Sequence, residues 1–289
     1  MLVPSPEAPV PQRFGLLSTA SVVEGVDTHE LNGIEYLAVC STQVDPYPVG
    51  PCPPETRPTK QPGQTISGFA ASPFGLYAAD ECTLGRDETE ARGQLRQRLL
   101  LGEQAAVERV IYDGRFGGTG DVVVSPNLRQ QAHVIETPAA GADPADAVGA
   151  LEHWLASTYG GAGVIHAPRW MAPQLHKAGA VTSVSGPRAT TLLGSSVVFG
   201  TGYDGSPPVQ EPALDDTHPW LYITPPITIR RSNIIEPASW TTGAFDRQQN
   251  RGLLLAERIY VVDWPCSVAA VKTNSTMFEP TAQIEEAPL

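Results

Sequence analysis

The longest regular pattern of the chain runs from Asp87 to Asp113. This stretch contains no proline, and acidic side chains at its start suit the positive end of a helix dipole. Gly114 follows as a suitable stop. Apolar or small residues recur at three- and four-residue steps, namely Ala91, Leu95, Leu99, Gly102, Ala106 and Val110. The pattern predicts an amphipathic helix about 40 Å long.

A second helix is marked by its start signals. Asp143 suits the N-cap, and Pro144 suits the first helical position. An apolar stripe continues from Ala147 to Leu155, and the helix should end before Gly160. A short buried strand over 163–167 and a short helix around 170–177 are expected to follow.

Several β-rich runs complete the pattern. Residues 14–39 contain two such runs around a polar break, which predicts a long hairpin. Further strands are predicted over 190–202, 220–232 and 252–264, with 267–273 as the pairing partner of the last. The proline-rich segment 44–64 cannot form a helix or a central strand, so it is interpreted as a loop.

Composition and charge exclude several classes of protein. The chain has 289 residues, 41% of them hydrophobic, which is enough for a substantial core. No apolar run approaches the roughly 18 residues of a membrane span. The formal net charge is −12 and no basic cluster occurs, so strong binding to nucleic acid through its phosphates is not expected.

The four cysteines are Cys40, Cys52, Cys82 and Cys266, and none forms a CxxC pair. Their spacing does not indicate a zinc site. A Cys40–Cys52 bridge across the proline-rich loop is geometrically possible, but four separate thiols are the favoured interpretation.

Two glycine motifs resemble nucleotide-binding loops only in their letters. Residues 200–205 fit GxGxxG, but prolines follow directly where a dinucleotide fold requires a helix. Residues 117–120 lack the Lys and Ser or Thr of a phosphate loop. Both are interpreted as turns.

No catalytic constellation is found. His166 lies in an apolar run and is expected to be a buried core histidine, since no metal-ligand spacing surrounds it. A catalytic nucleophile could be chosen, either Cys266 with a histidine or Ser125. Such a choice is arbitrary, because no sequence signature of a nucleophile is present. The sequence therefore predicts no catalytic, cofactor-binding or metal-binding residue and no enzymatic activity.

The order of these elements resembles the major capsid proteins of tailed phages, which share the Hong Kong 97 coat fold with encapsulin shells. The hairpin 14–39 is placed like the extended loop of that family, and the helix 87–113 like its spine helix. The segments DPADAVGALEHWLAS and GVIHAPRWMAPQLHKAG resemble the axial domain, and LLGSSVVFGTGYDG resembles the strand that returns from that domain. The segment NRGLLLAERIYVVDWPCSVAAVKT resembles the closing strand pair of the peripheral domain.

The resemblance implies an α+β shell subunit with the Hong Kong 97-type fold. The implied parts are an N-terminal arm (1–13), an extended hairpin with the proline-rich loop (14–64), a peripheral domain with the spine helix (65–135), an axial domain (136–219), the closing strands of the peripheral domain (220–273) and a C-terminal tail (274–289).

The implied function is self-assembly into an icosahedral head that encloses DNA. Identical subunits in pentamers and hexamers are the implied partners, with scaffold, portal or decoration proteins as further ones. The protein would contact packaged DNA only weakly and non-specifically, and it would need no cofactor and bind no membrane. It would reside in the virion after assembly in the host cytoplasm. Three alternatives remain open: a head–tail connector or tail-tube subunit, an encapsulin-like shell, and an unrecognised small-molecule hydrolase.

Overall fold

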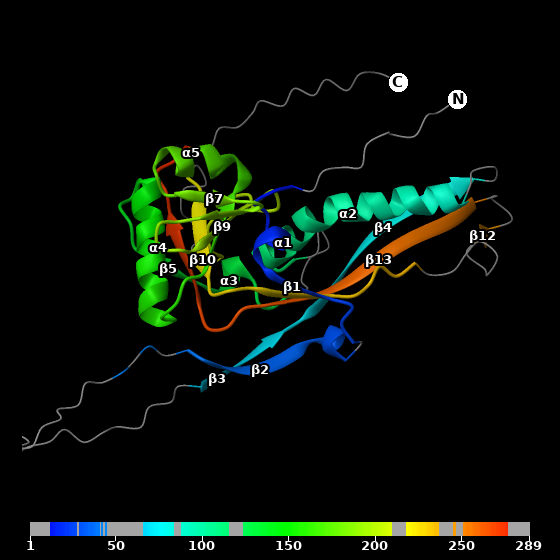
Figure 1. The fold of residues 1–289 in the computed structure, drawn as a ribbon, viewed down its shortest axis with the longest axis horizontal. Coiled ribbons are helices and arrows are strands. Elements are labelled where there is room, and N and C mark those ends of the chain that lie inside the picture. Colours follow the sequence, from blue (N-terminus) through cyan, green and yellow to red (C-terminus); the bar gives the residue numbers. More distant parts are fainter. Residues whose placement is uncertain are drawn as a thin grey trace, which may run out of the picture.

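A computed structural model describes most of the chain. The described residues are 12–27, 29–40, 42, 44, 66–83, 88–115, 124–209, 218–236, 245–246 and 251–276. Within them, no helix is long and apolar enough to cross a membrane. Figure 1 shows three parts: a sheet flanked by short helices, a long ribbon with a helix along it, and a separate hairpin.

The long ribbon belongs to a five-stranded sheet. Its strands are β1 (Ser21–Glu24), β11 (Thr228–Arg231), β13 (Arg251–Asp263), β12 (Phe245–Asp246) and β4 (Pro73–Thr83). β4 and β13 pair in antiparallel fashion over eleven residue pairs, whereas β1 runs parallel to β11. Helix α2 (Glu88–Asp113) packs along this ribbon (Figure 1).

The second sheet has seven strands in the order β5, β14, β10, β6, β9, β8, β7. Their bounds are Ala132–Ile135, Val268–Lys272, Trp220–Thr224, Val164–Pro168, Ser196–Gly200, Arg188–Thr190 and Ser183–Ser185. Helices α4 (Pro144–Thr158) and α5 (Ala172–Lys177), with the 3₁₀ turn η2 (Arg169–Met171), share a core with one face. The C-terminal half of α2 and the short α3 (Leu128–Gln131) share a core with the other. Because both faces are covered, the central strands read as continuous apolar runs.

The third part is an antiparallel hairpin made of β2 (Ile34–Val39) and β3 (Ile66–Ala71). A 3₁₀ turn, η1 (Glu30–Asn32), precedes it. The short helix α1 (Leu16–Thr19) lies nearer the N-terminus and packs against β9 and α2.

The two long helices predicted from the sequence are confirmed. α2 ends at Asp113, and Gly114 adopts a left-handed φ of 70° that favours glycine. The side chain of Asp143 accepts a hydrogen bond from the backbone N–H of Ala145, as an N-cap residue should. The buried stripe of α2 differs slightly from the predicted one, because Gly102 is exposed and Glu103 is buried in its place.

Three predictions about strand pairing are wrong. Residues 14–39 do not form a hairpin: β1 pairs with β11, and β2 pairs with β3 across the proline-rich segment. The run 220–232 is not one strand, because the chain passes at Pro225 and Pro226 from β10 in one sheet to β11 in the other. The run 267–273 does not pair with 252–264; β14 pairs with β5 and β10 instead. In each case tertiary partners far along the chain replace sequence neighbours.

Leu99 lies at the centre of the buried stripe of α2, so Leu99→Pro should lower the free energy of unfolding by about 3 kcal/mol. Proline removes a helical N–H, and its ring clashes with the preceding turn. Gly102→Ala is the matched control: a Cβ there meets no atom within 4 Å, so it should raise helix stability by about 0.5–1 kcal/mol. Urea unfolding followed by circular dichroism measures both, and equal stabilities of Leu99→Pro and the unmodified chain would contradict the prediction.

Candidate assembly surface

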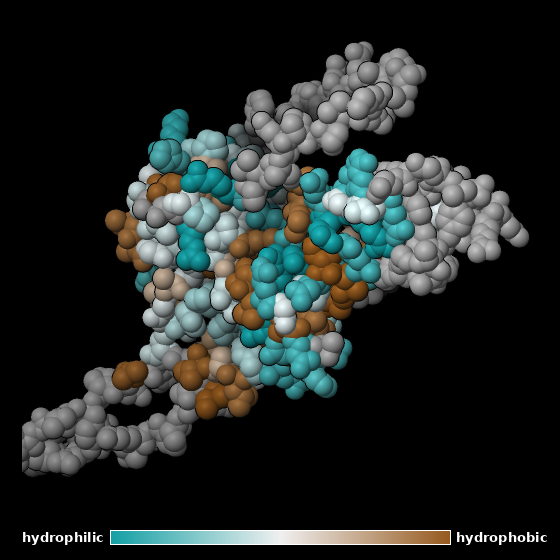
Figure 2. Space-filling view, turned by 45° about the vertical axis from the view of Figure 1, so that its right-hand side comes forward, coloured by the Kyte–Doolittle hydropathy of each residue, from teal (hydrophilic) through white to brown (hydrophobic). Residues whose placement is uncertain are grey.

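The β2–β3 hairpin presents an apolar face to solvent. Side chains along β2 alternate between half-buried and exposed, and the exposed set includes Leu37 and Val39. Leu37 is 75% exposed, Val39 is 63% exposed, and Ile66 opposite Val39 is 51% exposed. Figure 2 shows apolar residues gathered at the far end of the hairpin, at the lower left of the view. A two-stranded hairpin is marginal in water on its own, so this face is suited to contact with another surface.

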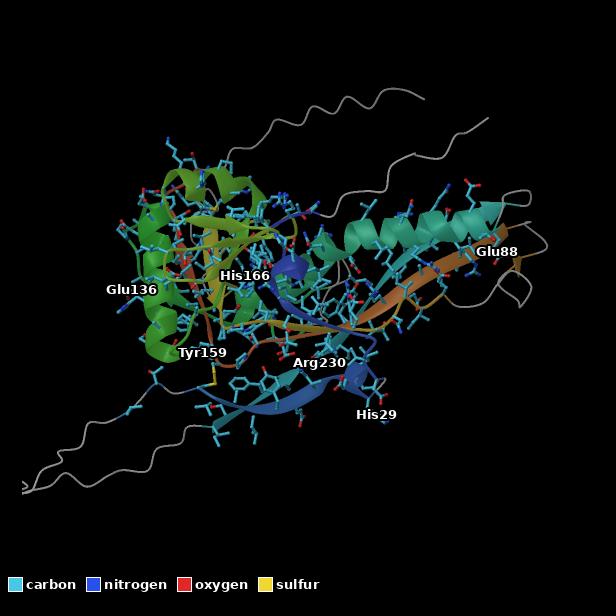
Figure 3. All side chains as sticks on the ribbon, in the orientation of Figure 1. His29, Glu88, Glu136, Tyr159, His166 and Arg230 are labelled. Carbon is cyan, nitrogen blue, oxygen red and sulfur yellow. A yellow bond between two sulfur atoms is a disulfide. The ribbon has the colours of Figure 1, made fainter. Side chains whose placement is uncertain are left out.

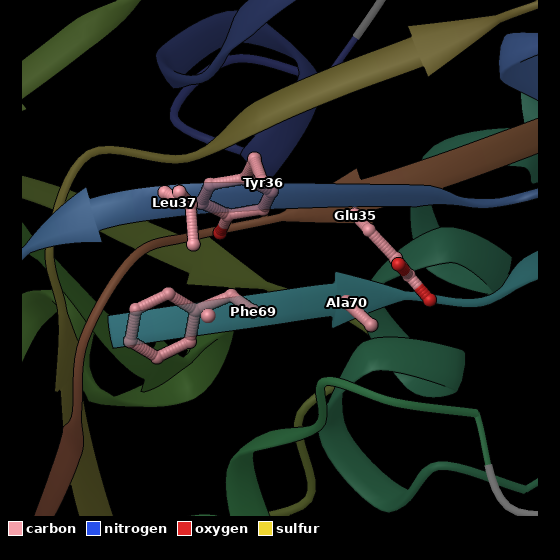
Figure 4. Close-up of a pocket in the computed structure, with 6 residues that line it drawn as sticks. Glu35, Tyr36, Leu37, Phe69 and Ala70 are labelled. Atoms are coloured by element: carbon pink, nitrogen blue, oxygen red, sulfur yellow. The ribbon is translucent and has the colours of Figure 1, made fainter. Parts of the chain in front are cut away.

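A hollow forms on the hairpin itself. It is lined by Glu35, Tyr36, Leu37, Gly68, Phe69 and Ala70, as Figure 4 shows. The rings of Tyr36 and Phe69, which are opposite each other in the register, have centroids 5.8 Å apart. Burial and the nearby carboxylate of Asp263 raise the pKa of Tyr36 to about 12. The phenol of Tyr36 therefore stays protonated and uncharged through the physiological range.

A second exposed face lies on the β4–β13 ribbon, where apolar side chains are opposite the carboxylates of Glu81 and Glu257. Tyr77 is 71% exposed, and Leu253 and Ile235 are also exposed. Phe74 and Ala78 on alternate positions of β4 are buried, so Tyr77 lies on the opposite face of the strand from them. The molecule thus carries two separate surfaces with exposed apolar side chains, and both are formed by extended strands.

A buried carboxylate joins α2 to the five-stranded sheet. Glu103 accepts hydrogen bonds from the guanidinium groups of Arg231 (2.8 Å) and Arg258 (2.9 Å), and from the hydroxyl of Tyr260 (2.7 Å). Arg231 also pairs with Glu24 of β1, and this hydrogen bond lowers the pKa of Glu24. This site was not predicted from the sequence. A single Glu within the apolar stripe of α2 was the available signal.

A second buried carboxylate on α2, Glu108, holds two other segments. It accepts hydrogen bonds from the backbone N–H of Leu16 in α1 (3.0 Å) and of Gly202 (3.1 Å). Burial raises its pKa above the usual value, against the opposing effect of these hydrogen bonds. A Cβ on Gly202 would lie 2.4 Å from the carbonyl oxygen of Ala105, so glycine is required where the turn meets the helix.

The GxGxxG segment 200–205 is a turn, as predicted, and no helix follows it through residue 209. The segment 117–120, also predicted as a turn, lies outside the described residues. The same holds for the proline-rich loop except Val44, for residues 1–11 of the predicted arm, and for the tail from residue 277.

His166 is a satisfied core histidine, as predicted. It lies buried in β6, where Nδ1 is 3.0 Å from the hydroxyl of Tyr203 and Nε2 is 3.1 Å from the hydroxyl of Thr224 (Figure 3). Burial lowers its pKa from 6.5 to about 3. The imidazole is therefore neutral at physiological pH and fully engaged inside the sheet.

The cysteine interpretation is wrong. Cys40 and Cys266 form a disulfide, with Cα atoms 5.3 Å apart, visible as the yellow bond in Figure 3. This pairing excludes a Cys40–Cys52 bridge, and Cys52 lies outside the described residues. The partners are separated by 226 positions, so only the fold brings them together. Cys266 is consequently no free thiol, and the nucleophile considered for it is not present in this structure.

The described part of the chain contains no cluster of three or more His, Cys, Asp or Glu residues that could hold a metal ion. The features that stand out are instead extended surfaces with exposed apolar side chains and buried groups that join the parts of the fold. Such an arrangement suits contacts with other macromolecules.

Neither a scan of protein-family models nor a search of curated proteins finds a match. Solved structures do match over nearly the whole chain. The capsid of a native GTA particle matches with a TM-score of 0.55 and 13% identity, covering 95% of each chain. A structure from Microbacterium phage Oxtober96 gives 0.56 and 11%, covering 94% of this chain and 95% of its own. The capsid of Ralstonia phage GP4 gives 0.52 and 8%, covering 97% and 96%.

These matches confirm the α+β class and the Hong Kong 97-type capsid fold that the order of elements predicted. At these identities the likeness establishes the fold. The strand order described above shows which segments of this chain form each sheet of that fold.

Proposed function

We propose that this chain is the major capsid subunit of a tailed phage and builds an icosahedral shell from identical copies. The observation that carries the proposal is the match, over about 95% of both chains, to structures that include capsids of particles. Pentamers and hexamers of this chain enclose DNA, and its location is the virion after assembly in the host cytoplasm. The role is structural and needs no cofactor.

The two strand surfaces with exposed apolar side chains support this proposal. A shell subunit contacts several neighbours at once, and the hairpin and the β4–β13 ribbon provide separated faces for such contacts. The net charge of −12 fits a container that touches its DNA only weakly. Scaffold, portal or decoration proteins complete the proposed set of partners.

We further propose that the two sheets mark the two domains of the subunit. The seven-stranded sheet with α4 and α5 forms the axial domain, and the five-stranded sheet with α2 forms the peripheral domain. Relative to the boundaries expected from the sequence, β5, β10 and β14 move into the axial domain, because each is paired within its sheet. The hairpin β2–β3 replaces 14–39 as the extended loop.

Negative-stain electron microscopy of the purified full-length protein, with its mass from light scattering, tests the proposal. Closed shells, or pentamers and hexamers, are expected. Rings or tubes without shells would instead indicate a connector or tail-tube subunit. A monomer that fails to assemble even with its neighbouring gene products would contradict the proposal.

Leu37→Asp should prevent assembly while leaving the folded subunit intact. The side chain is three-quarters exposed, so the substitution should change the free energy of unfolding by no more than about 0.5 kcal/mol. A charge at the centre of an apolar contact, however, would be buried without a partner. Light scattering of assembly reactions measures the effect.

Ser67→Asp is the charge-matched control for Leu37→Asp. Ser67 is an exposed residue of β3 opposite Ala38, on the other face of the same hairpin. The Ser67→Asp variant should assemble normally. Equal assembly by both variants would show that the apolar face of the hairpin makes no contact between subunits.

A further inference from the structure

The disulfide ties the far end of the hairpin, where β2 ends and β3 begins, to the body. Cys40 follows β2 directly, and Cys266 lies in the loop where the chain leaves the five-stranded sheet for the seven-stranded one. Cys266 has a φ of 66°, in the left-handed region that favours glycine. A side chain at such a position costs conformational energy, so the presence of cysteine there is best explained by the bond it makes.

The two ends of the hairpin are held differently. At the end away from Cys40, β3 continues into β4 through Ser72, whose N–H donates to the carbonyl of Ser125. Between the two ends, Tyr36 is partly buried near Asp263 of β13. At the Cys40 end, the hydroxyl of Thr42 donates to the carbonyl of Ser157 at an exposed position. The disulfide is the covalent link between this end and the body.

A cavity separates the hairpin from the body beside the disulfide. Its hairpin side is formed by Gly68, Phe69 and Ala70, and its body side includes Pro126, Trp264 and Cys266 itself. Because this cavity separates the two sides at the disulfide end, fewer contacts oppose movement of that end once the disulfide is open. The bond therefore controls how firmly the hairpin is held.

We propose that Cys40 and Cys266 form a redox lock on the hairpin, an inference that rests on the proposed shell function for its biological setting. In a reducing cytoplasm the two thiols stay reduced, and the hairpin turns about its junction with β4 while subunits assemble. Oxidation then fixes the hairpin against the body in the geometry of this structure. The lock makes the particle more rigid after it leaves the reducing compartment.

The chemistry requires an oxidant, and a low-molecular-weight disulfide such as oxidised glutathione supplies it. One cysteine thiolate attacks that disulfide, forms a mixed disulfide and releases one glutathione thiolate. The second cysteine thiolate attacks the mixed disulfide at the protein sulfur, which forms the Cys40–Cys266 bond and releases the second glutathione. Two protein thiols are oxidised, one glutathione disulfide is reduced, and excess dithiol reverses the process.

Hydrogen exchange on the full-length subunit tests the lock. The protein is compared after oxidation with glutathione disulfide and after reduction with dithiothreitol. Reduction should speed exchange of the amides in β2 and β3 by about tenfold or more and leave α4 unchanged. The Cys40→Ser and Cys266→Ser variants should exchange at the reduced rate under both conditions, and Cys82→Ser should respond like the unmodified chain.

Peptide mapping with thiol alkylation at lysis gives the second readout. Alkylated Cys40 and Cys266 are expected in freshly broken cells, and a Cys40–Cys266 linked peptide in released particles. Exchange rates that do not change with the redox state would contradict the proposed lock. Complete formation of the Cys40–Cys266 linked peptide inside cells would contradict it as well. Because the exchange experiment needs only the subunit, a failure of the shell proposal would appear separately, as an absence of particles.

Discussion

Replacing Glu103 with alanine should lower the free energy of unfolding by about 3–5 kcal/mol. The carboxylate is buried and accepts hydrogen bonds from Arg231, Arg258 and the hydroxyl of Tyr260. Its removal leaves the buried guanidinium of Arg258 without its carboxylate partner, and it leaves Arg231 paired only with the exposed Glu24. Glu103→Gln should be nearly as costly, because it keeps the shape but lacks the charge.

The matched control is Arg96→Ala on the same helix. Arg96 makes an ion pair with Glu236, but its side chain is more than half exposed. Exposed pairs contribute little, so the control should cost less than about 1 kcal/mol. Urea unfolding of the three variants beside the unmodified chain gives the comparison. If Glu103→Ala cost no more than Arg96→Ala, Glu103 would not join α2 to the sheet as described.

The functional consequence of Glu103 follows from its place in the fold. It connects α2 to β11 and β13, and through Arg231 also to β1. The ribbon face with Tyr77 and the long helix therefore share one buried electrostatic junction. We expect assembly to fail in Glu103→Ala before the subunit unfolds completely, since the ribbon would lose its fixed position against the helix.

The parts of the fold that were predictable from the sequence have local signals. α2 and α4 are marked by caps and by apolar steps of three and four residues, which depend only on neighbouring residues. β6 is marked by a largely apolar run, and β13 by apolar runs on both sides of Glu257 and Arg258. The burial of His166 was also predictable, because a single histidine within an apolar strand is expected to be buried together with its neighbours.

The parts that were not predictable depend on distant partners. The side chains of β2 alternate clearly between half-buried and exposed. Its partner β3, however, follows only after a long proline-rich segment, and nothing near β2 in the sequence identifies that partner. Cys40 and Cys266 are 226 positions apart, and their meeting requires the whole fold. Pro225 and Pro226 break the predicted strand 220–232, and that break could have been anticipated from the missing backbone donors.

Acidification should destabilise the subunit through His166. Its folded-state pKa of about 3 lies below the ordinary 6.5, so the unfolded chain binds a proton before the folded one does. The stabilising contribution of the neutral ring is complete above pH 6.5 and is lost as pH falls from 6.5 toward 3. One pKa unit corresponds to about 1.4 kcal/mol, so about 3 kcal/mol should be lost by pH 4.5 and about 4 kcal/mol by pH 3.

His166→Gln isolates this contribution, because glutamine can reach Tyr203 and Thr224 but does not titrate. We expect this variant to be less stable than the unmodified chain at pH 7.5, and the difference between them to shrink by about 3 kcal/mol on going to pH 4.5. His153→Gln, at an exposed position of α4, controls for the loss of one histidine and should parallel the unmodified chain. Urea unfolding at both pH values measures all three, and a difference that does not change with pH would mean that His166 takes up its proton equally in the folded and unfolded states.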